Sequence, residues 1–354
     1  MEYKGKYSIF NTDNIKTYPI FLRRNKVKIN SFVKLDVISQ TQYEISSSVR
    51  EKIKEVALQI IRARKAKKPV IFFTGAHLIK NGLSPILLDL IKRNMVTLIA
   101  SNGAGAIHDF ELSLMGETSE DVPNALPEGK FGMAYEFAYI NETLRLGNIM
   151  KLGYGESLGR VMGDAHFKEM ALKSVLRKGS PENFKYPDKS VLAVAYEHNI
   201  PVTIHAAIGT DVVDEHPGFD GETRGGTSGR DFLIFVNEVT KLDKGGVILN
   251  VGSAVIGPEV LLKAVSMAAN TAHPPKSIIT ADFDLRPFRP ENMSSEEAYH
   301  YYFRDQKSVV TRIPESFGGK GFYIQGNQKI TLPLLYQYII KCLEEGQRRG
   351  NKEK

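Results

Sequence analysis

The chain alternates between short continuous apolar runs and longer stretches whose apolar residues recur every three or four positions. Continuous runs of strand length are typical of strands buried on both faces of a parallel sheet, and the wider spacing indicates helices that bury one face. The predicted strands are 69–74, 96–100, 201–204, 246–251 and 277–281. The predicted helices are one opened by a Ser48–Glu51 capping box, then 85–93, 131–151, 156–177, 190–198, 229–241, 257–269 and a last one opened by Thr331 and Pro333.

This order of elements predicts an α/β fold, a Rossmann-like and mainly parallel sheet with helices on both faces. We expect residues 1–45 to form an N-terminal arm with short strands near 7–10 and 33–38. Residues 46–346 then form a single nucleotide-binding domain with a loop insertion at 212–230, and residues 347–354 form a basic tail. Because ligands of such sheets bind beyond the carboxyl ends of the strands, the turns that follow the strands are the candidate sites.

Small residues fill three of these turns, and one of them opens a helix whose N–H groups could face a phosphate. The predicted cofactor-binding residues of the turns are Gly75, Ser101, Asn102, Gly103, Ala104, Gly105, Gly252 and Ser253. Two Gly-rich turns in one sheet favour a dinucleotide, and Asp282 follows a strand, where its carboxylate could bind ribose hydroxyls. The full fingerprint has a third glycine where Ile107 or His108 stands, so an ordinary strand-to-helix turn remains an alternative.

Imidazole and carboxylate side chains are most concentrated between His205 and Asp231, after a predicted strand. His205, Asp211 and His216 could bind a divalent metal, although their spacing matches no metal signature. The carboxylates could instead hold a substrate amine, with a histidine as general base. A solvated loop in which Asp and Gly only make turns is the remaining interpretation.

Composition limits the classes of function. Hydrophobic residues make up 42% of the 354 residues, charged residues make up 25%, and no run of 18 apolar residues predicts a membrane span. The single cysteine excludes an internal disulfide and indicates a reducing cytoplasm. The formal charge of +7 comes largely from clusters that lack interleaved aromatic residues, which disfavours nucleic-acid binding.

Several motifs, in the same order, resemble the deoxyhypusine synthase group, whose NAD-binding fold is shared with sirtuins. Residues 94–110 are similar to the family's strand and Thr-Thr-Ala-Gly-Gly loop, with Asp109 as the aspartate that ends the motif. Residues 73–83 and 200–232 resemble its preceding loop and its Thr-Asp-Gly-Ser segment, and 246–249 resemble its next strand. The resemblance implies bound NAD, Asp109 among the cofactor residues, a homotetramer and a site at a subunit interface.

The chain also departs from the family pattern. Deoxyhypusine synthases hold the aminobutyl group as an imine on a lysine in a Ser-Trp-Gly-Lys run. This chain has no tryptophan, and no lysine follows Asp282 until Lys307. Ile107 and His108 replace an acidic pair of the family. We therefore carry over the NAD-binding scaffold and not the reaction.

The sequence predicts a cytoplasmic, homo-oligomeric enzyme that uses NAD on a small amine or hydroxyl substrate and is not a true deoxyhypusine synthase. Histidine titrates near neutrality, so His108 or His205 is expected to carry the proton, while Asp211 and Asp231 orient a cationic group. The predicted catalytic residues are His108, His205, Asp211, His216 and Asp231, and no metal site is predicted. The alternatives are a metal-assisted hydrolase that uses His205, Asp211 and His216, or a nucleotide-binding module without catalysis.

Overall fold

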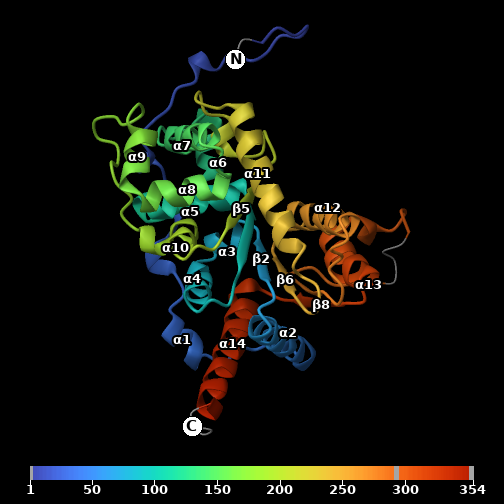
Figure 1. Cartoon of the computed structure of the whole chain (residues 1–354). Helices are drawn as coiled ribbons and strands as arrows, with labels where there is room; N and C mark the ends of the chain where they lie inside the picture. Colours follow the sequence, from blue (N-terminus) through green and yellow to red (C-terminus); the bar gives the residue numbers. More distant parts are fainter. Residues whose placement is uncertain (1–2, 291–294, 351–354) are drawn as a thin grey trace.

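The centre of the protein is a six-stranded parallel sheet (Figure 1). The computed structural model describes residues 3–290 and 295–350. The strands are β2 (Val70–Thr74), β3 (Leu98–Asn102), β5 (Val202–His205), β6 (Val247–Val251), β7 (Ile279–Asp284) and β8 (Lys320–Gln325). Their order across the sheet is β5-β3-β2-β6-β7-β8. Numbered among themselves along the chain, these strands have the order 3-2-1-4-5-6 of doubly wound dinucleotide-binding folds, so the predicted Rossmann-like α/β class is confirmed.

Side chains of each central strand alternate between two hydrophobic cores. In β2, Phe72 packs into the core on one face, whereas Ile71 and Phe73 pack into the core on the other. All five residues of β2 and of β6 are buried, because helices cover both faces of the sheet. This arrangement explains why the strands read as continuous apolar runs rather than as alternating ones.

Helices from the early, middle and last parts of the chain cover the Phe72 face. They are α2 (Ser47–Lys65), α4 (Ser84–Lys92), α5 (Gly103–Met115), α8 (Tyr154–Gly163), α10 (Val191–Glu197) and α14 (Gln328–Gly350). The opposite face is covered by α11 (Gly221–Val239), α12 (Ile256–Asn270), the π-helix Asp305–Arg312 and α13 (Ile313–Ser316). Further out lie α3 (His77–Lys80), α6 (Val122–Ala125), α7 (Phe137–Ile149) and α9 (Ala165–Leu172).

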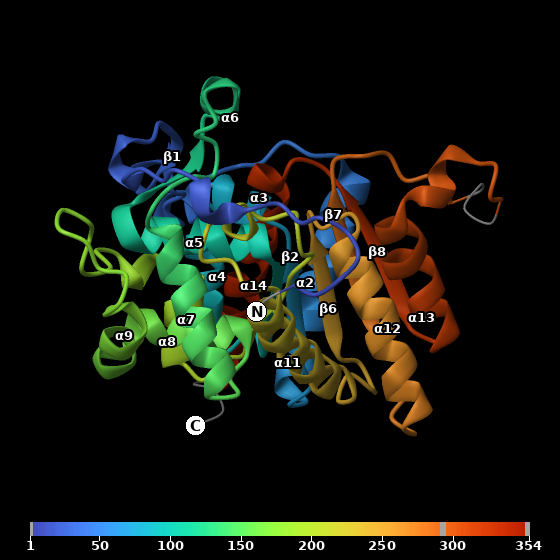
Figure 2. The ribbon, with the colours of Figure 1, turned by 90° about the horizontal axis from the view of Figure 1, so that it is seen from above.

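The N-terminal segment differs from its predicted form. Residues 7–10 form no strand and are exposed. Residues 33–38 lie mostly in the short helix α1 (Leu35–Gln40), which buries Ile38 beside α14. The strand of this segment is instead β1 (Asn25–Lys28), which pairs antiparallel with β4 (Glu117–Glu120) next to α6 (Figure 2). The two strands of this ribbon contain one apolar residue, Val27, so they give almost no strand signal in the sequence.

Several element boundaries were also predicted incorrectly. The Ser46 hydroxyl, rather than that of Ser48, caps α2 by accepting from the Val49 N–H. The second half of the 212–230 segment is not a loop, because α11 begins at Gly221, where Asp220 caps the Glu222 and Thr223 N–H groups. The expected basic tail 347–354 is helical to residue 350, and residues 351–354 lie outside the described residues.

Candidate functional site at the carboxyl end of the sheet

The strand order reverses between β2 and β6, and the two turns that follow these strands touch each other. The Gly75 N–H donates to the Val251 carbonyl oxygen at 3.0 Å. A Cβ atom on Gly75 would collide with the Gly252 carbonyl oxygen, and one on Gly252 would collide with the Gln328 side chain. Gly252 also has a φ of +64°, which favours glycine. These glycines therefore serve the close contact between two parts of the chain.

The turn between β3 and α5 is also filled by the protein's own polar groups. The Asn102 side chain caps α5 by accepting from the Gly105 N–H at 2.9 Å. A side chain on Gly105 would strike the Ser101 hydroxyl, and one on Gly103 would strike the Asp211 carboxylate. Asp211 thus occupies the N-terminal end of α5, where the helix dipole favours an anion. A phosphate at this turn would compete with Asp211 for that place.

Asp211 is held there by a buried arginine. The Arg224 guanidinium, on α11, donates to Asp211 Oδ2 at 2.7 Å and to the Tyr154 hydroxyl at 2.5 Å. It also forms an ion pair with Asp214 at 2.8 Å. Burial raises the pKa of Asp211, and Arg224 opposes that rise. Because Arg224 is 1% exposed, the position of Asp211 is fixed by the interior of the protein.

A cavity of about 220 Å³ opens beside Asp211 and α5. Its walls come from α3, α5, β4, the N-terminal segment and the loop after β5. The polar or aromatic side chains that line it include Arg23, Lys80, His108, Glu120, Phe131 and Asp211. Of the predicted catalytic residues, the cavity therefore brings together His108 and Asp211.

His108 is oriented by a buried ionic cluster on one wall of this cavity. Its Nδ1 lies 2.6 Å from the Thr118 hydroxyl, which hydrogen bonds to Glu111. Arg23 donates to Glu111 at 2.5 Å and lies 3.8 Å from Glu120. Burial alone would raise the pKa of Glu111, but Arg23 and the hydrogen bonds from His108 and Thr118 lower it to about 2. One imidazole nitrogen of His108 is thus fixed, which orients the ring and leaves the other nitrogen for chemistry.

The structure places His205 in the hydrophobic core. Its ring stacks on Phe73 with a centroid distance of 5.3 Å and meets the edge of Phe235. Its Nε2 lies 3.1 Å from the Thr203 hydroxyl. Burial lowers the pKa of His205 to about 3, so the ring is neutral at physiological pH. His205 does pair with Asn102 in the sheet register, next to the α5 turn.

Three other predicted site residues make hydrogen bonds that support the fold. Asp109 accepts from the Ser190 hydroxyl and the Val191 N–H at the start of α10, and burial raises its pKa to about 6. Asp231 accepts from the Gly155 and Ile204 N–H groups at 2.9 and 2.7 Å, and burial raises its pKa to about 8. His216 Nδ1 accepts from the Gly218 N–H within a turn.

These positions bear on the metal-assisted alternative. His205 faces aromatic rings, Asp211 binds Arg224, and His216 closes a turn. Within residues 3–290 and 295–350, no group of three or more His, Cys, Asp or Glu side chains is placed to hold a metal ion.

A second polar region lies at the carboxyl ends of β6 and β7. The Asn250 side-chain amide donates to Asp282 Oδ1 at 2.7 Å and to the Ser253 carbonyl oxygen. The Ser253 hydroxyl accepts from the Gly257 N–H in the first turn of α12. Among the described residues, the buried oxygens Asn250 Oδ1 and Asp282 Oδ2 receive no hydrogen bond. Burial and the nearby Asp305 raise the pKa of Asp282.

Sequence reasoning missed the residues that complete this region. Arg286 forms ion pairs with Asp284 at 2.8 Å and with Asp305 of the π-helix. Lys307 is 2% exposed and lies over the Tyr301 ring, and its pKa is lowered by burial. The alternation Asp282, Asp284, Arg286 was visible as a signal, but nothing in the sequence linked it to residues 305–307.

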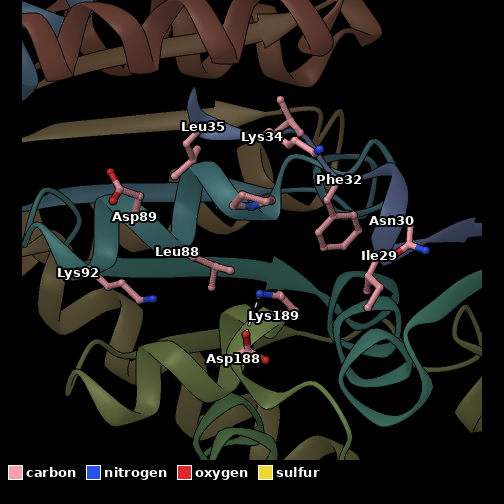
Figure 3. A pocket seen from close by; sticks show the side chains of 12 residues that line it. Ile29, Asn30, Phe32, Lys34, Leu35, Leu88, Asp89, Lys92, Asp188 and Lys189 are labelled. Atoms are coloured by element: carbon pink, nitrogen blue, oxygen red, sulfur yellow. Dashed lines mark ion pairs between the residues drawn. The ribbon is translucent and has the colours of Figure 1, made fainter. Parts of the chain in front are cut away.

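A larger cavity, of about 690 Å³, is lined by other segments of the chain (Figure 3). It is bounded by residues 29–35, by α4 and by residues 188–189, and it is lined by Phe32, Leu88 and Lys92, among others. None of the predicted site residues lines it. The smaller cavity is therefore the candidate site, because it combines a histidine, a carboxylate and the carboxyl ends of the strands.

The sheet order and the position of the cavity define the class of this protein, a doubly wound α/β protein with a polar site beyond the carboxyl ends of its strands. No described helix has both the length and the apolar character that a bilayer span requires. No protein-family model matches the chain. No curated protein matches it either.

Solved structures with a similar course of the chain include three of interest. The complex of AgrE with ornithine and NAD+ has 14% identity and a TM-score of 0.47, and the match covers 86% of this chain and 35% of AgrE. A candidate LOR/SDH protein from Methanococcus maripaludis S2 has 16% identity and a TM-score of 0.45, and the match covers 85% of this chain and 73% of that protein. A candidate deoxyhypusine synthase from Entamoeba histolytica has 9% identity and a TM-score of 0.37, and the match covers 89% of this chain and 96% of that protein. The chain thus spans about a third of the length of AgrE.

Proposed function

We propose that the protein is an NAD-assisted enzyme that acts on a small amine or hydroxyl substrate. The observation that carries this proposal is the 3-2-1-4-5-6 sheet with a polar cavity at the carboxyl ends of its strands, where His108 and Asp211 meet. Sheets of this order bind dinucleotides at that end. A histidine and a carboxylate in one cavity supply a proton carrier and an anchor for a substrate.

The two halves of the sheet fit a dinucleotide differently. The turn before α5 fits poorly, because Asp211 and Ser101 fill the space beside its glycines. The turn before α12 fits better. Ala254 and Val255 are exposed at the start of this 15-residue helix, whose N-terminus favours a pyrophosphate. Asn250 and Asp282 supply buried oxygens that could accept hydrogen bonds from ribose hydroxyls. We therefore assign NAD to the α12 half of the site.

The chain's own residues have separate tasks in this proposal. His108, held through Nδ1 by Thr118, takes the proton from a substrate hydroxyl or amine. Asp211, held by Arg224, orients the cationic end of an amine. Bound NAD would supply a hydride acceptor. His205, His216, Asp109 and Asp231 are assigned to the fold, because their polar atoms contact neighbouring backbone or side chains.

The relation to deoxyhypusine synthases remains part of the proposal. On the sequence resemblance we propose that the protein binds NAD, forms a homotetramer and has its site close to a subunit interface. The reaction differs, because the chain lacks the Ser-Trp-Gly-Lys run. We also propose that the enzyme works in the cytoplasm, which its single cysteine supports.

The test uses the thermal shift that NAD causes when it binds the native state selectively. Substitutions at Gly103 or Gly252 would not isolate binding, because a side chain there collides with Asp211 or Gln328. Val255 is 55% exposed and takes the N-cap position of α12, where its side chain makes no capping hydrogen bond. Val255→Asp puts a negative charge where the pyrophosphate would bind, while the same charge is favourable for the helix itself.

We expect millimolar NAD to raise the melting temperature of the unsubstituted protein. Val255→Asp should reduce that shift at least threefold without lowering the melting temperature of the free protein. Val255→Asn is the matched control, because it offers a similar cap without the charge and should keep the full shift. No shift with NAD in the unsubstituted protein would overturn the proposal, and equal shifts in all three proteins would overturn the assignment to α12.

A further inference from the structure

The size of the cavity beside His108 limits what it can hold. At about 220 Å³ it has room for roughly seven water molecules, each of which takes about 30 Å³ in the liquid. Pockets for drug-sized ligands have volumes of about 300–1,000 Å³. The cavity therefore fits a small metabolite and leaves the dinucleotide outside it.

Most of the charged groups around the cavity are already paired with one another. Arg23 binds Glu111 and lies beside Glu120. The two carboxylate oxygens of Glu120 also accept from the Tyr18 hydroxyl and the Gly132 N–H. These groups form a wall whose hydrogen-bonding capacity is largely used, so a ligand gains little from them.

Lys80 is a further cation that lines the cavity. It comes from α3 and is half-buried, and its ammonium group has no ion pair or hydrogen bond within the described part of the chain. Lys80 and His108 both lie close enough to His77 to lower the pKa of its imidazole, after burial itself. Lys80 and His108 both line the cavity, and the ammonium group of Lys80 would stabilise a negatively charged group there.

Asp211 supplies the complementary group. Its Oδ2 accepts from Arg224, whereas its Oδ1 receives no hydrogen bond from residues 3–290 or 295–350. The cavity is therefore lined by one available ammonium group, by one available carboxylate oxygen and by the imidazole of His108. A ligand that satisfies both must have one negative and one positive end.

We propose that the cavity binds a small amino acid, whose carboxylate pairs with Lys80 and whose ammonium group pairs with Asp211. This inference deepens the proposed function by naming its substrate class, and it rests on that function only for the reaction that follows binding. His108 then lies beside a substrate whose amine or hydroxyl can lose a proton.

The experiment compares amino acids with the amines that remain when their carboxylate is removed. Isothermal titration with glycine, alanine, serine, threonine and valine, each beside its decarboxylated amine, is carried out on the full-length protein with and without NAD. We expect at least one amino acid to bind at least tenfold more tightly than its amine. Lys80→Gln should abolish that preference, because it should weaken binding of the amino acid at least tenfold and binding of the amine less than twofold. Lys80→Arg should keep most of the preference.

Failure of this proposal can be distinguished from failure of the proposed function. The thermal shift with NAD should be the same in Lys80→Gln as in the unsubstituted protein. If NAD binds but no amino acid of the panel does, or if Lys80→Gln leaves the preference intact, the amino-acid proposal is overturned. If an amino acid binds with the expected dependence on Lys80 while NAD does not bind, the NAD proposal alone is overturned.

Discussion

At the scale of single residues, the surroundings of a side chain decide its chemistry more than its type does. His108 and His205 were equal candidates in the sequence. The structure fixes His108 beside Glu111 at the wall of a cavity and stacks His205 on Phe73 in the core. Likewise, Asp211 and Asp231 each line a cavity, but Asp231 joins α8 and β5 by accepting from their backbone N–H groups. Burial and partners therefore separate a candidate catalytic residue from a structural one.

The raised pKa of Asp231 gives a testable dependence of stability on pH. An unfolded aspartate titrates near 3.9, whereas Asp231 in the native state titrates at about 8. Between these values the native state binds the extra proton, so the contribution of Asp231 to the free energy of unfolding falls as pH rises. Asp231→Asn removes this dependence, and an amide oxygen in the place of Oδ2 can still accept from Gly155 and Ile204.

Urea unfolding at pH 5, 6.5 and 8 checks this expectation. The unsubstituted protein should lose up to about 1.4 kcal/mol per pH unit more than Asp231→Asn, the slope for one proton. Asp188→Asn serves as a control, because the Asp188 side chain is largely exposed. Parallel pH profiles for the unsubstituted protein and Asp231→Asn would contradict the burial argument.

At the scale of elements, the sequence was sufficient to predict the strands whose residues are all buried. The strands β2 and β6 are apolar throughout because both of their faces are covered, and this pattern needs no knowledge of partners. The ribbon β1–β4 and the strand β8 were missed, because a polar or partly exposed strand depends on a neighbour for its hydrogen bonds. The start of α11 was missed because glycines at 225, 226 and 229 lower helix propensity.

Two neighbouring glycines of α11 are expected to respond differently to the same substitution. A Cβ atom on Gly225 meets no atom within 4 Å, whereas one on Gly226 would press against the Asn148 side chain. Gly225→Ala should raise the free energy of unfolding by about 0.5–1 kcal/mol, because alanine loses less backbone entropy in a helix. Gly226→Ala should raise the free energy of unfolding by less, or lower it. Thermal unfolding of both variants measures the difference. Equal stabilisation would show that Asn148 moves freely.

At the scale of the whole molecule, the candidate site is assembled from distant parts of the chain. Arg23, Lys80, His108 and Asp211 share one cavity although they belong to four separate segments. The sequence predicted two of these residues, because they follow strands. It could not predict Arg23 or Lys80, because their places depend on how the N-terminal segment and α3 pack on α5.

Two deletions test the contribution of the N-terminal segment. The side chains of residues 3–16 are mostly exposed, so removal of residues 1–16 should leave the free energy of unfolding within about 0.5 kcal/mol. Removal of residues 1–28 also deletes β1, the buried Arg23 and the fully buried Ile20. Because Glu111 and Glu120 then lose their buried cation, we expect a loss of about 3–5 kcal/mol or more in urea unfolding. Similar stability of the two truncated proteins would contradict this account.

The pairing of Arg23 with Glu111 also sets an order of events during synthesis. Arg23 precedes Glu111 by 88 residues, and ribosomes add about 5–20 residues per second. Arg23 therefore waits about 4–18 seconds for its carboxylate partner after it has been translated. During that interval β1 has no strand to pair with, since β4 follows Glu111 in the chain. The segment of Arg23 and β1 thus takes its place only after residues 111–120 have been made, and the cavity acquires its ionic wall only then.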